Sequence, residues 1–197
     1  MEYACIPRHP ELGSYKVLDS VNDFNTGLQA IAVAPVDQNG QPDTTQITIA
    51  YAGTHDAGDY RTDAASIGFG IPTAQMRQAD DFAKHIINTY KPADLSFTGH
   101  SLGGYTAMSM AGKYKASATT FNASSALSDL KGEPEVKAYI ARNPDKFNNY
   151  IVSNDLVGNF GLDPSTDLNT TVHTGKMPKK YKFYSLPELY KTFQTIS

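Results

Sequence analysis

The 197-residue chain is poor in the features that mark disulfide-linked, metal-bound and membrane-spanning proteins. Its one cysteine, Cys5, excludes a disulfide within the chain, and no cysteine-histidine cluster has structural-zinc spacing. No window approaches the run of about 18 apolar residues that spans a bilayer. The N-terminus has no apolar run behind a basic region. We therefore expect neither a transmembrane segment nor a Sec-type signal. This expectation fits a secreted effector that lacks such a signal, or a domain of a longer protein.

The chain also lacks a large excess of charge of either sign. Its 17 basic and 20 acidic residues give a formal net charge of -3. This balance gives no electrostatic reason to expect binding to nucleic acid or to an anionic membrane, so any lipid contact is expected to be apolar. With 40% hydrophobic residues, the chain has enough apolar side chains for one core, and residues 1–197 are predicted to form a single domain.

One stretch combines a strand pattern, a tight turn and the start of a helix around a serine. It reads Ser96-Phe97-Thr98-Gly99-His100-Ser101-Leu102-Gly103-Gly104-Tyr105. Its Gly-x-Ser-x-Gly core is typical of a nucleophile elbow, whose turn strains the serine backbone and places Oγ above the sheet. Glycines on either side let the strand and the helix approach closely, because they have no Cβ. A five-residue pattern occurs by chance in many chains, but this context predicts that Ser101 is a nucleophile.

Segments with strand patterns alternate with segments of helical periodicity. Strands are predicted at 29–36, 46–52, 95–98, 116–121, 149–153 and 181–186, the first two as a hairpin around Asn39-Gly40. Helices are predicted at 72–90, 104–114, within 124–143 and at 187–196. This alternation predicts an α/β fold with a mostly parallel central sheet and helices on both faces. Together with the elbow motif, it indicates a fold of the α/β-hydrolase type. Active groups in such sheets gather at the carboxyl ends of the strands.

Ser101 needs a base to accept its proton and a carboxylate to orient that base. His173 is the only histidine after Ser101, and the polar residues around it predict a loop. Asp155 follows the strand at 149–153, where the acid of an α/β-hydrolase belongs. The predicted triad is therefore Ser101, Asp155 and His173. Three other aspartates remain as alternatives for the acid: Asp129, Asp163 and Asp167.

The charge that develops on the substrate oxygen needs hydrogen-bond donors fixed in advance. The amide of Leu102, the residue after the nucleophile, is predicted to be one donor. A second donor normally comes from the loop after the neighbouring strand, which here begins at Gly53. Thr54 is the predicted residue, because its amide and its hydroxyl can both donate.

Four residues beside this predicted site are candidate substrate contacts: His55, His100, Phe69 and Phe160. His100 holds the variable elbow position, whose side chain usually packs beside the nucleophile. The two phenylalanines lie on flanking loops and either line an acyl pocket or belong to the core. A metal site formed by His55, Asp59 and Asp63 is conceivable, but such residues in a polar loop are usually solvated. Neither a metal nor a cofactor is expected.

These residues resemble the class 3, or fungal-type, lipase family and its bacterial phospholipase A1-like relatives. Residues 98–104 match that family's Gly-His-Ser-Leu-Gly-Gly elbow, and residues 50–54 are similar to its strand ending in Arg-Gly-Thr or Arg-Gly-Ser. Residues 120–123 and 154–157 stand where the family has two further motifs, and the second of these carries the acid. The resemblance covers residues 46–175. It departs from the family at Ala52, which replaces an arginine, and in its short length, which argues against a large lid.

The resemblance implies hydrolysis of a carboxylic ester, with a lipid or another acyl ester as substrate and an acyl-enzyme as intermediate. An elbow and a triad do not name the leaving group, so a thioesterase, an acyltransferase or a peptidase is the alternative within the enzymes. A non-catalytic binding domain is the alternative outside them. Its sign would be a broken triad, and no member of the triad is missing from this sequence.

Overall fold

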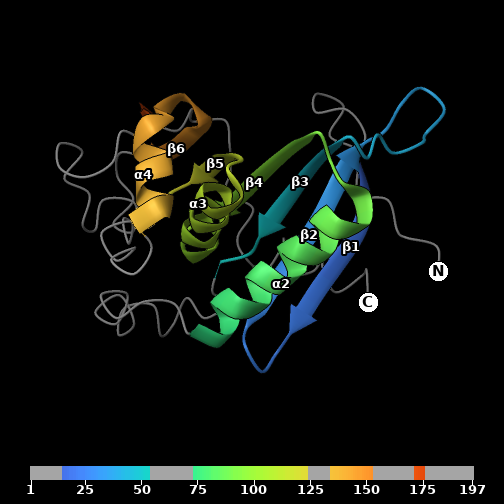
Figure 1. The fold of residues 1–197 in the computed structure, drawn as a ribbon, viewed down its shortest axis with the longest axis horizontal. Helices are drawn as coiled ribbons and strands as arrows, with labels where there is room; N and C mark the ends of the chain where they lie inside the picture. Colours follow the sequence, from blue (N-terminus) through green and yellow to red (C-terminus); the bar gives the residue numbers. More distant parts are fainter. Residues whose placement is uncertain (1–14, 54–72, 124–133, 153–170, 176–197) are drawn as a thin grey trace.

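The computed structural model describes residues 15–53, 73–123, 134–152 and 171–175 (Figure 1). Within these ranges the chain forms a seven-stranded sheet in the order β1-β2-β3-β4-β5-β6-β7. The strands are β1 (Tyr15–Asp23), β2 (Leu28–Pro35), β3 (Gln46–Tyr51), β4 (Asp94–His100), β5 (Ser117–Phe121), β6 (Phe147–Val152) and β7 (Thr171–Gly175). The helices are α2 (Thr73–Tyr90), α3 (Leu102–Tyr114), α4 (Pro134–Arg142) and the 3-10 turn η3 (Pro144–Lys146).

The sheet is parallel over most of its width. β1 pairs with β2 and β2 with β3 in antiparallel fashion, whereas β3 to β7 pair in parallel. The predicted hairpin around Asn39-Gly40 is confirmed, and Gly40 adopts a φ of 75° that favours glycine. Because β3 to β7 run in the same direction, their carboxyl ends share one edge of the sheet. The α/β fold with a mostly parallel sheet is thus confirmed.

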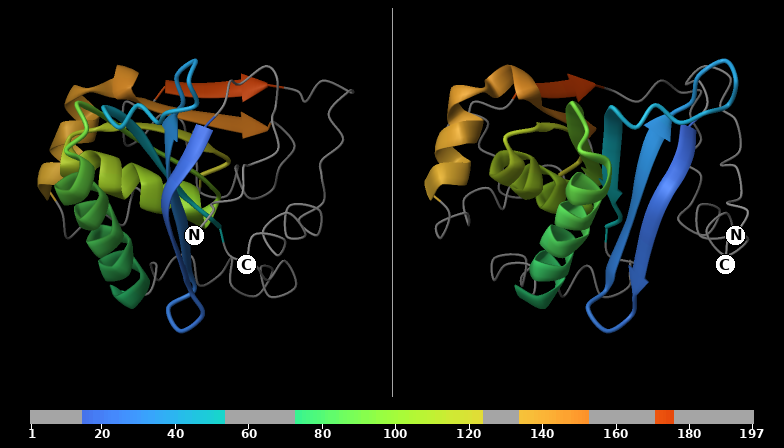
Figure 2. Two further views of the ribbon diagram at one scale, coloured as in Figure 1. Left: turned by 90° about the vertical axis from the view of Figure 1, so that its right-hand side faces the viewer. Right: turned by 45° about the vertical axis from the view of Figure 1, so that its right-hand side comes forward.

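Helices α2, α3 and α4 all cover the same face of the sheet, as the two views of Figure 2 show. Within the described residues no helix covers the opposite face. The helix predicted at 187–196 and the strand predicted at 181–186 lie outside those residues. No helix in the described part of the chain has both the length and the apolar character that a bilayer crossing requires.

His173 lies in a strand, so the prediction of a polar loop around it is wrong. Residues 171–175 form β7, which pairs in parallel with β6, and His173 is the register partner of Tyr150. The segment is rich in threonine and contains Val172, and such β-branched residues favour extended backbone. The polar residues that suggested a loop are equally compatible with a strand.

The core between the helices and the sheet is centred on Phe97 of β4, which is 1% exposed. Its ring stacks between Tyr51 and Tyr114, with 6.3 Å between ring centroids on each side. The Tyr51 hydroxyl donates to the carbonyl of Ala79 at 3.0 Å, and burial raises the pKa of Tyr51 far above its ordinary value. The neutral Tyr51 therefore ties β3 to α2 beneath the carboxyl edge of the sheet.

A buried carboxylate joins α2 to α3. Asp80 is 8% exposed, accepts a hydrogen bond from the Tyr114 hydroxyl at 2.6 Å and contacts Lys113 Nζ at 3.0 Å. It also forms an ion pair with Lys84, one turn along α2. Burial alone would raise the pKa of Asp80, but hydrogen bonds from Lys84, Tyr114 and Lys113 outweigh it and lower the pKa below its ordinary value. Asp80 is therefore charged at neutral pH and holds α2 against α3.

We expect Asp80→Asn to lower the free energy of unfolding at pH 7 by about 1–3 kcal/mol, because bonds to a charged acceptor are lost. The folded-state pKa of Asp80 is depressed, so its contribution is full above the unfolded value of about 3.9 and is lost as pH falls through the folded-state pKa. The difference in free energy of unfolding between wild type and Asp80→Asn should therefore shrink as the pH falls below about 4. Denaturant unfolding at several pH values measures this difference. Asp81→Asn is the matched control, because the Asp81 side chain is 74% exposed. Equal losses in both variants would contradict the assignment.

Candidate active site

Ser101 occupies the turn between β4 and α3 with a backbone conformation that few non-glycine residues adopt. Its φ is 55° and its ψ is -120°, and it is 4% exposed. A positive φ outside the left-handed helical region strains a residue with a Cβ, and such strain persists only where the surroundings enforce it. The Ser101 N–H donates to Phe121 O of β5 at 3.0 Å, and its carbonyl accepts from Tyr105 N–H at 3.2 Å. The turn predicted as a nucleophile elbow is present in the structure.

Glycines on both sides of Ser101 allow strand, turn and helix to touch backbone to backbone. A Cβ built on Gly99 would lie 2.3 Å from Gly103 O. One built on Gly103 would lie 2.3 Å from Tyr51 O and 2.7 Å from the Ala52 carbonyl. Any side chain at either position would therefore force apart the strands and the helix that define the turn.

We expect Gly103→Ala to destabilise the protein by about 3 kcal/mol or more, since the added methyl meets rigid backbone of β3. Gly112→Ala on the same helix is the matched control. Its Cβ would lie 2.5 Å from Val136 Cγ1, the end of a side chain that can move. Thermal or denaturant unfolding of both variants checks the prediction. A Gly112→Ala protein that is less stable than Gly103→Ala would contradict it.

The end of β3 lies against Ser101. A Cβ built on Gly53 would be 2.9 Å from His100 O and 3.6 Å from Ser101 Cβ. The chain therefore leaves β3 directly beside Ser101, and this is the route that the oxyanion prediction requires. Thr54 itself, with His55 and Phe69, lies outside the described residues. Leu102 opens α3 immediately after Ser101, where helix N–H groups lack intrahelical partners and the helix dipole favours negative charge.

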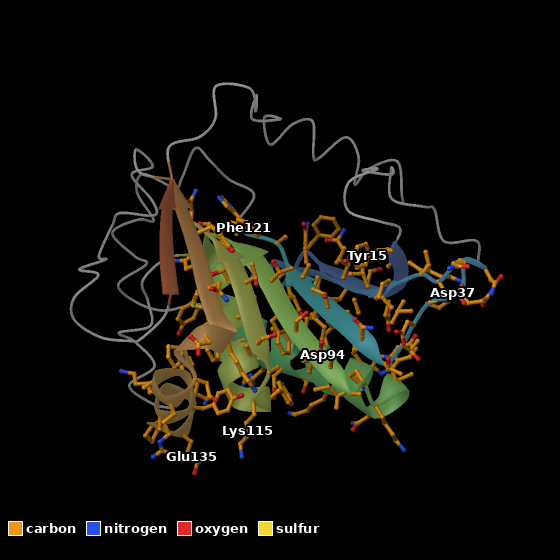
Figure 3. The ribbon with its side chains drawn as sticks, turned by 90° about the horizontal axis from the view of Figure 1, so that it is seen from above. Tyr15, Asp37, Asp94, Lys115, Phe121 and Glu135 are labelled. Atoms are coloured by element: carbon orange, nitrogen blue, oxygen red, sulfur yellow. The ribbon has the colours of Figure 1, made fainter. Side chains whose placement is uncertain are left out.

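His100 and Phe121 are register partners at the carboxyl ends of β4 and β5, and both are exposed. Figure 3 shows Phe121 at the end of the sheet opposite to Asp94, which begins β4. Phe121 stacks on Tyr150 of β6 with 5.7 Å between ring centroids. The predicted role of His100 as a substrate contact stays a prediction, and so does that of Phe160, which lies outside the described residues.

The structure shows the backbone position of one of the two predicted partners of Ser101. Asp155 lies beyond Val152, the last residue of β6, and outside the described residues. His173 is on β7, and two strands separate β7 from the elbow strand β4. At about 4.8 Å per strand, the backbones of His100 and His173 are about 14 Å apart across the sheet. The role of His173 as the base stays a prediction.

A buried amide near the elbow was not recognised from the sequence. Asn149 of β6 is 4% exposed and bonds to Thr120 and Ala123, beside the elbow. The available signal was its spacing from Phe147, because residues two apart on a strand share a face. A polar residue on the buried face of a strand requires hydrogen-bond partners, and the sequence does not show which residues supply them.

The sequence matches a family described as phospholipase-like, the Tle-like phospholipase domain, over residues 10–176. This range contains the elbow and all seven strands. The chain belongs to this phospholipase-like family. A search of curated proteins gave no match for this phospholipase-like chain.

Solved fungal lipase structures have the same fold. A mutant form of MDLA from Penicillium cyclopium is 15% identical with a TM-score of 0.56, and the match covers 89% of this chain and 69% of that one. A triacylglycerol lipase from Penicillium expansum is 14% identical with a TM-score of 0.50, covering 82% and 70%. The phospholipase-like chain spans only 54% of the length of a Rhizomucor miehei lipase chain. At these identities the likeness shows the α/β-hydrolase fold alone.

Proposed function

We propose that this chain is a serine hydrolase that cleaves carboxylic esters of lipids through an acyl-enzyme, with Ser101 as nucleophile. Ser101 Oγ attacks the ester carbonyl carbon while its proton passes to a base, and a tetrahedral intermediate forms. The bond to the alcohol oxygen then breaks, the base returns the proton to that oxygen, and the acyl group remains on Ser101. Water attacks the acyl-enzyme in the same way, which releases the carboxylic acid and restores the serine.

The strained backbone of Ser101 is the observation that carries this proposal. A serine that only packed between a strand and a helix would gain nothing from a φ of 55° and a ψ of -120°. Three backbone contacts through glycines enforce the conformation, and the residue lies at the carboxyl edge of a parallel sheet. Active groups of α/β folds gather at that edge.

The proposed oxyanion donors are the amide of Leu102 and the amide or hydroxyl of Thr54. Leu102 is the first residue of α3, so its N–H is at the positive end of the helix dipole. A Cβ built on Gly53 would lie 3.6 Å from Ser101 Cβ, and Thr54 is the next residue in the chain. The two donors would thus approach the carbonyl oxygen from adjoining elements, as in other α/β-hydrolases.

The proposed base is His173 and the proposed acid is Asp155. The order Ser101, Asp155, His173 along the chain supports this assignment. The backbones of His100 on β4 and His173 on β7 are about 14 Å apart across the sheet, so the assignment depends on chain order rather than on strand order. His55, two residues after Gly53 in the sequence, is the rival base, and mutation distinguishes the two.

The experiment that tests the proposal is labelling of the folded protein with a fluorophosphonate probe, followed by mass spectrometry of the modified peptide. We expect one adduct, on Ser101. A panel of p-nitrophenyl esters of rising chain length, a thioester, an amide and phospholipids then identifies the leaving group. Hydrolysis of oxygen esters in preference to thioesters and amides is expected. A folded protein that is neither labelled nor active on any of these substrates would be a binding domain and would refute the proposal.

A further inference from the structure

The side-chain amide of Asn149 bonds to both backbone groups of Ala123. Its Oδ1 accepts from Ala123 N–H at 3.2 Å, and its Nδ2 donates to Ala123 O at 3.5 Å. Oδ1 also accepts from the Thr120 hydroxyl at 3.1 Å. Asn149 and Thr120 are register partners on β6 and β5, 4% and 0% exposed. The amide therefore acts as a substitute peptide group that extends the pairing of these two strands.

The substitute is needed because the backbone ladder ends before Ala123. The last backbone bond between the two strands' ends is from Asn122 N–H to Tyr150 O, at 2.9 Å. Asn122 then takes a φ of 44°, which turns the chain away from the line of β5. Ala123 is 2% exposed, and a buried peptide group without partners is costly. Asn149 supplies both partners at the point where the strand can no longer do so.

Ala123 in turn supports the elbow. A Cβ built on Gly104 would lie 2.6 Å from Ala123 Cβ, so the methyl of Ala123 fills the space beside the first turn of α3. Two residues earlier, Phe121 O accepts the Ser101 N–H at 3.0 Å. The segment 121–123 thus contacts the elbow at the nucleophile itself and three residues beyond it.

We propose that Asn149 is a positioning residue for Ser101. By fixing Ala123 against Gly104, it keeps the segment 121–123 in place, and that segment holds Ser101 in its strained conformation. Asn149 bonds to Thr120 and Ala123, so its effect on Ser101 passes through the end of β5 and the residues that follow it. Its role as a determinant of activity rests on the proposed function, whereas its effect on the geometry of the elbow does not.

The test compares Asn149→Ala with Thr120→Val. Asn149→Ala removes every bond to Ala123, whereas Thr120→Val removes one bond to the same amide and leaves Ala123 held. The first readout is hydrogen exchange of the Ser101 amide, and the second is the rate of labelling by a fluorophosphonate well below the melting temperature. We expect exchange at least about tenfold faster and labelling about tenfold to a hundredfold slower in Asn149→Ala. Both rates should stay within about threefold of wild type in Thr120→Val.

A second variant keeps the test decisive if Asn149→Ala does not fold. Ala123→Gly preserves the bonds to Asn149 but removes the methyl that meets Gly104, and it should also speed exchange of the Ser101 amide and slow labelling. Wild-type rates in a folded Asn149→Ala, or equal losses in Asn149→Ala and Thr120→Val, would overturn the proposal. If wild type is never labelled while the exchange difference is found, the proposed function fails and the positioning role stands.

Discussion

Ser101→Ala is expected to abolish ester hydrolysis, with a loss of more than about a thousandfold in kcat. The proposed nucleophile has no substitute, since the elbow presents a single hydroxyl at its apex. The fold should persist, because alanine adds no atom to the turn and meets the same backbone restriction as serine. Hydrolysis of a p-nitrophenyl ester, labelling by a fluorophosphonate and a thermal unfolding curve measure the three effects.

Ser109→Ala is the matched control for this variant. Ser109 lies on the same helix, is 2% exposed, and its Oγ has no hydrogen-bond partner among the described residues. Removing that hydroxyl should leave activity within about threefold of wild type. A folded Ser101→Ala protein that retains near-normal turnover would exclude the acyl-enzyme mechanism, whatever the control shows.

His173→Ala is expected to lower kcat by several orders of magnitude if His173 is the base, whereas His55→Ala should leave most of the activity. The loss follows because an un-ionised serine hydroxyl attacks esters poorly without a proton acceptor. His85→Ala is the control, since His85 is half exposed on α2 and pairs with Asp19 at 3.1 Å. Initial rates on one soluble ester, measured for all three variants, make the comparison.

The pH dependence of wild type supplies an independent check on the base. A neutral imidazole must accept the serine proton, so kcat/KM should fall below an apparent pKa of about 6–7. The sign follows because protonation at low pH removes the acceptor. If His55→Ala is inactive and His173→Ala keeps most of its activity, the base lies in the segment after β3 and β7 is structural. That outcome would agree with the strand order, which separates β7 from β4 by β5 and β6.

The sequence alone was enough to predict the elements that depend on local patterns. The Asn39-Gly40 turn, the helix that follows Pro72 and the elbow around Ser101 are each specified by residues within a few positions of one another, and all three are present. Glycine spacing indicated the turn at Ser101 because only glycine permits the backbone contacts found there. The mostly parallel sheet followed from the alternation of strand and helix patterns.

Tertiary structure decided the features that depend on register and on strand order. His173 shares its polar neighbourhood with many loops, and only its pairing with Tyr150 shows that it belongs to β7, three strand positions from β4. Asn149 is unremarkable in the sequence, because its partners Thr120 and Ala123 are more than twenty residues away. Local propensity acts over neighbouring residues, whereas the distance between strands and the bonds of a buried amide are set by how the sheet assembles.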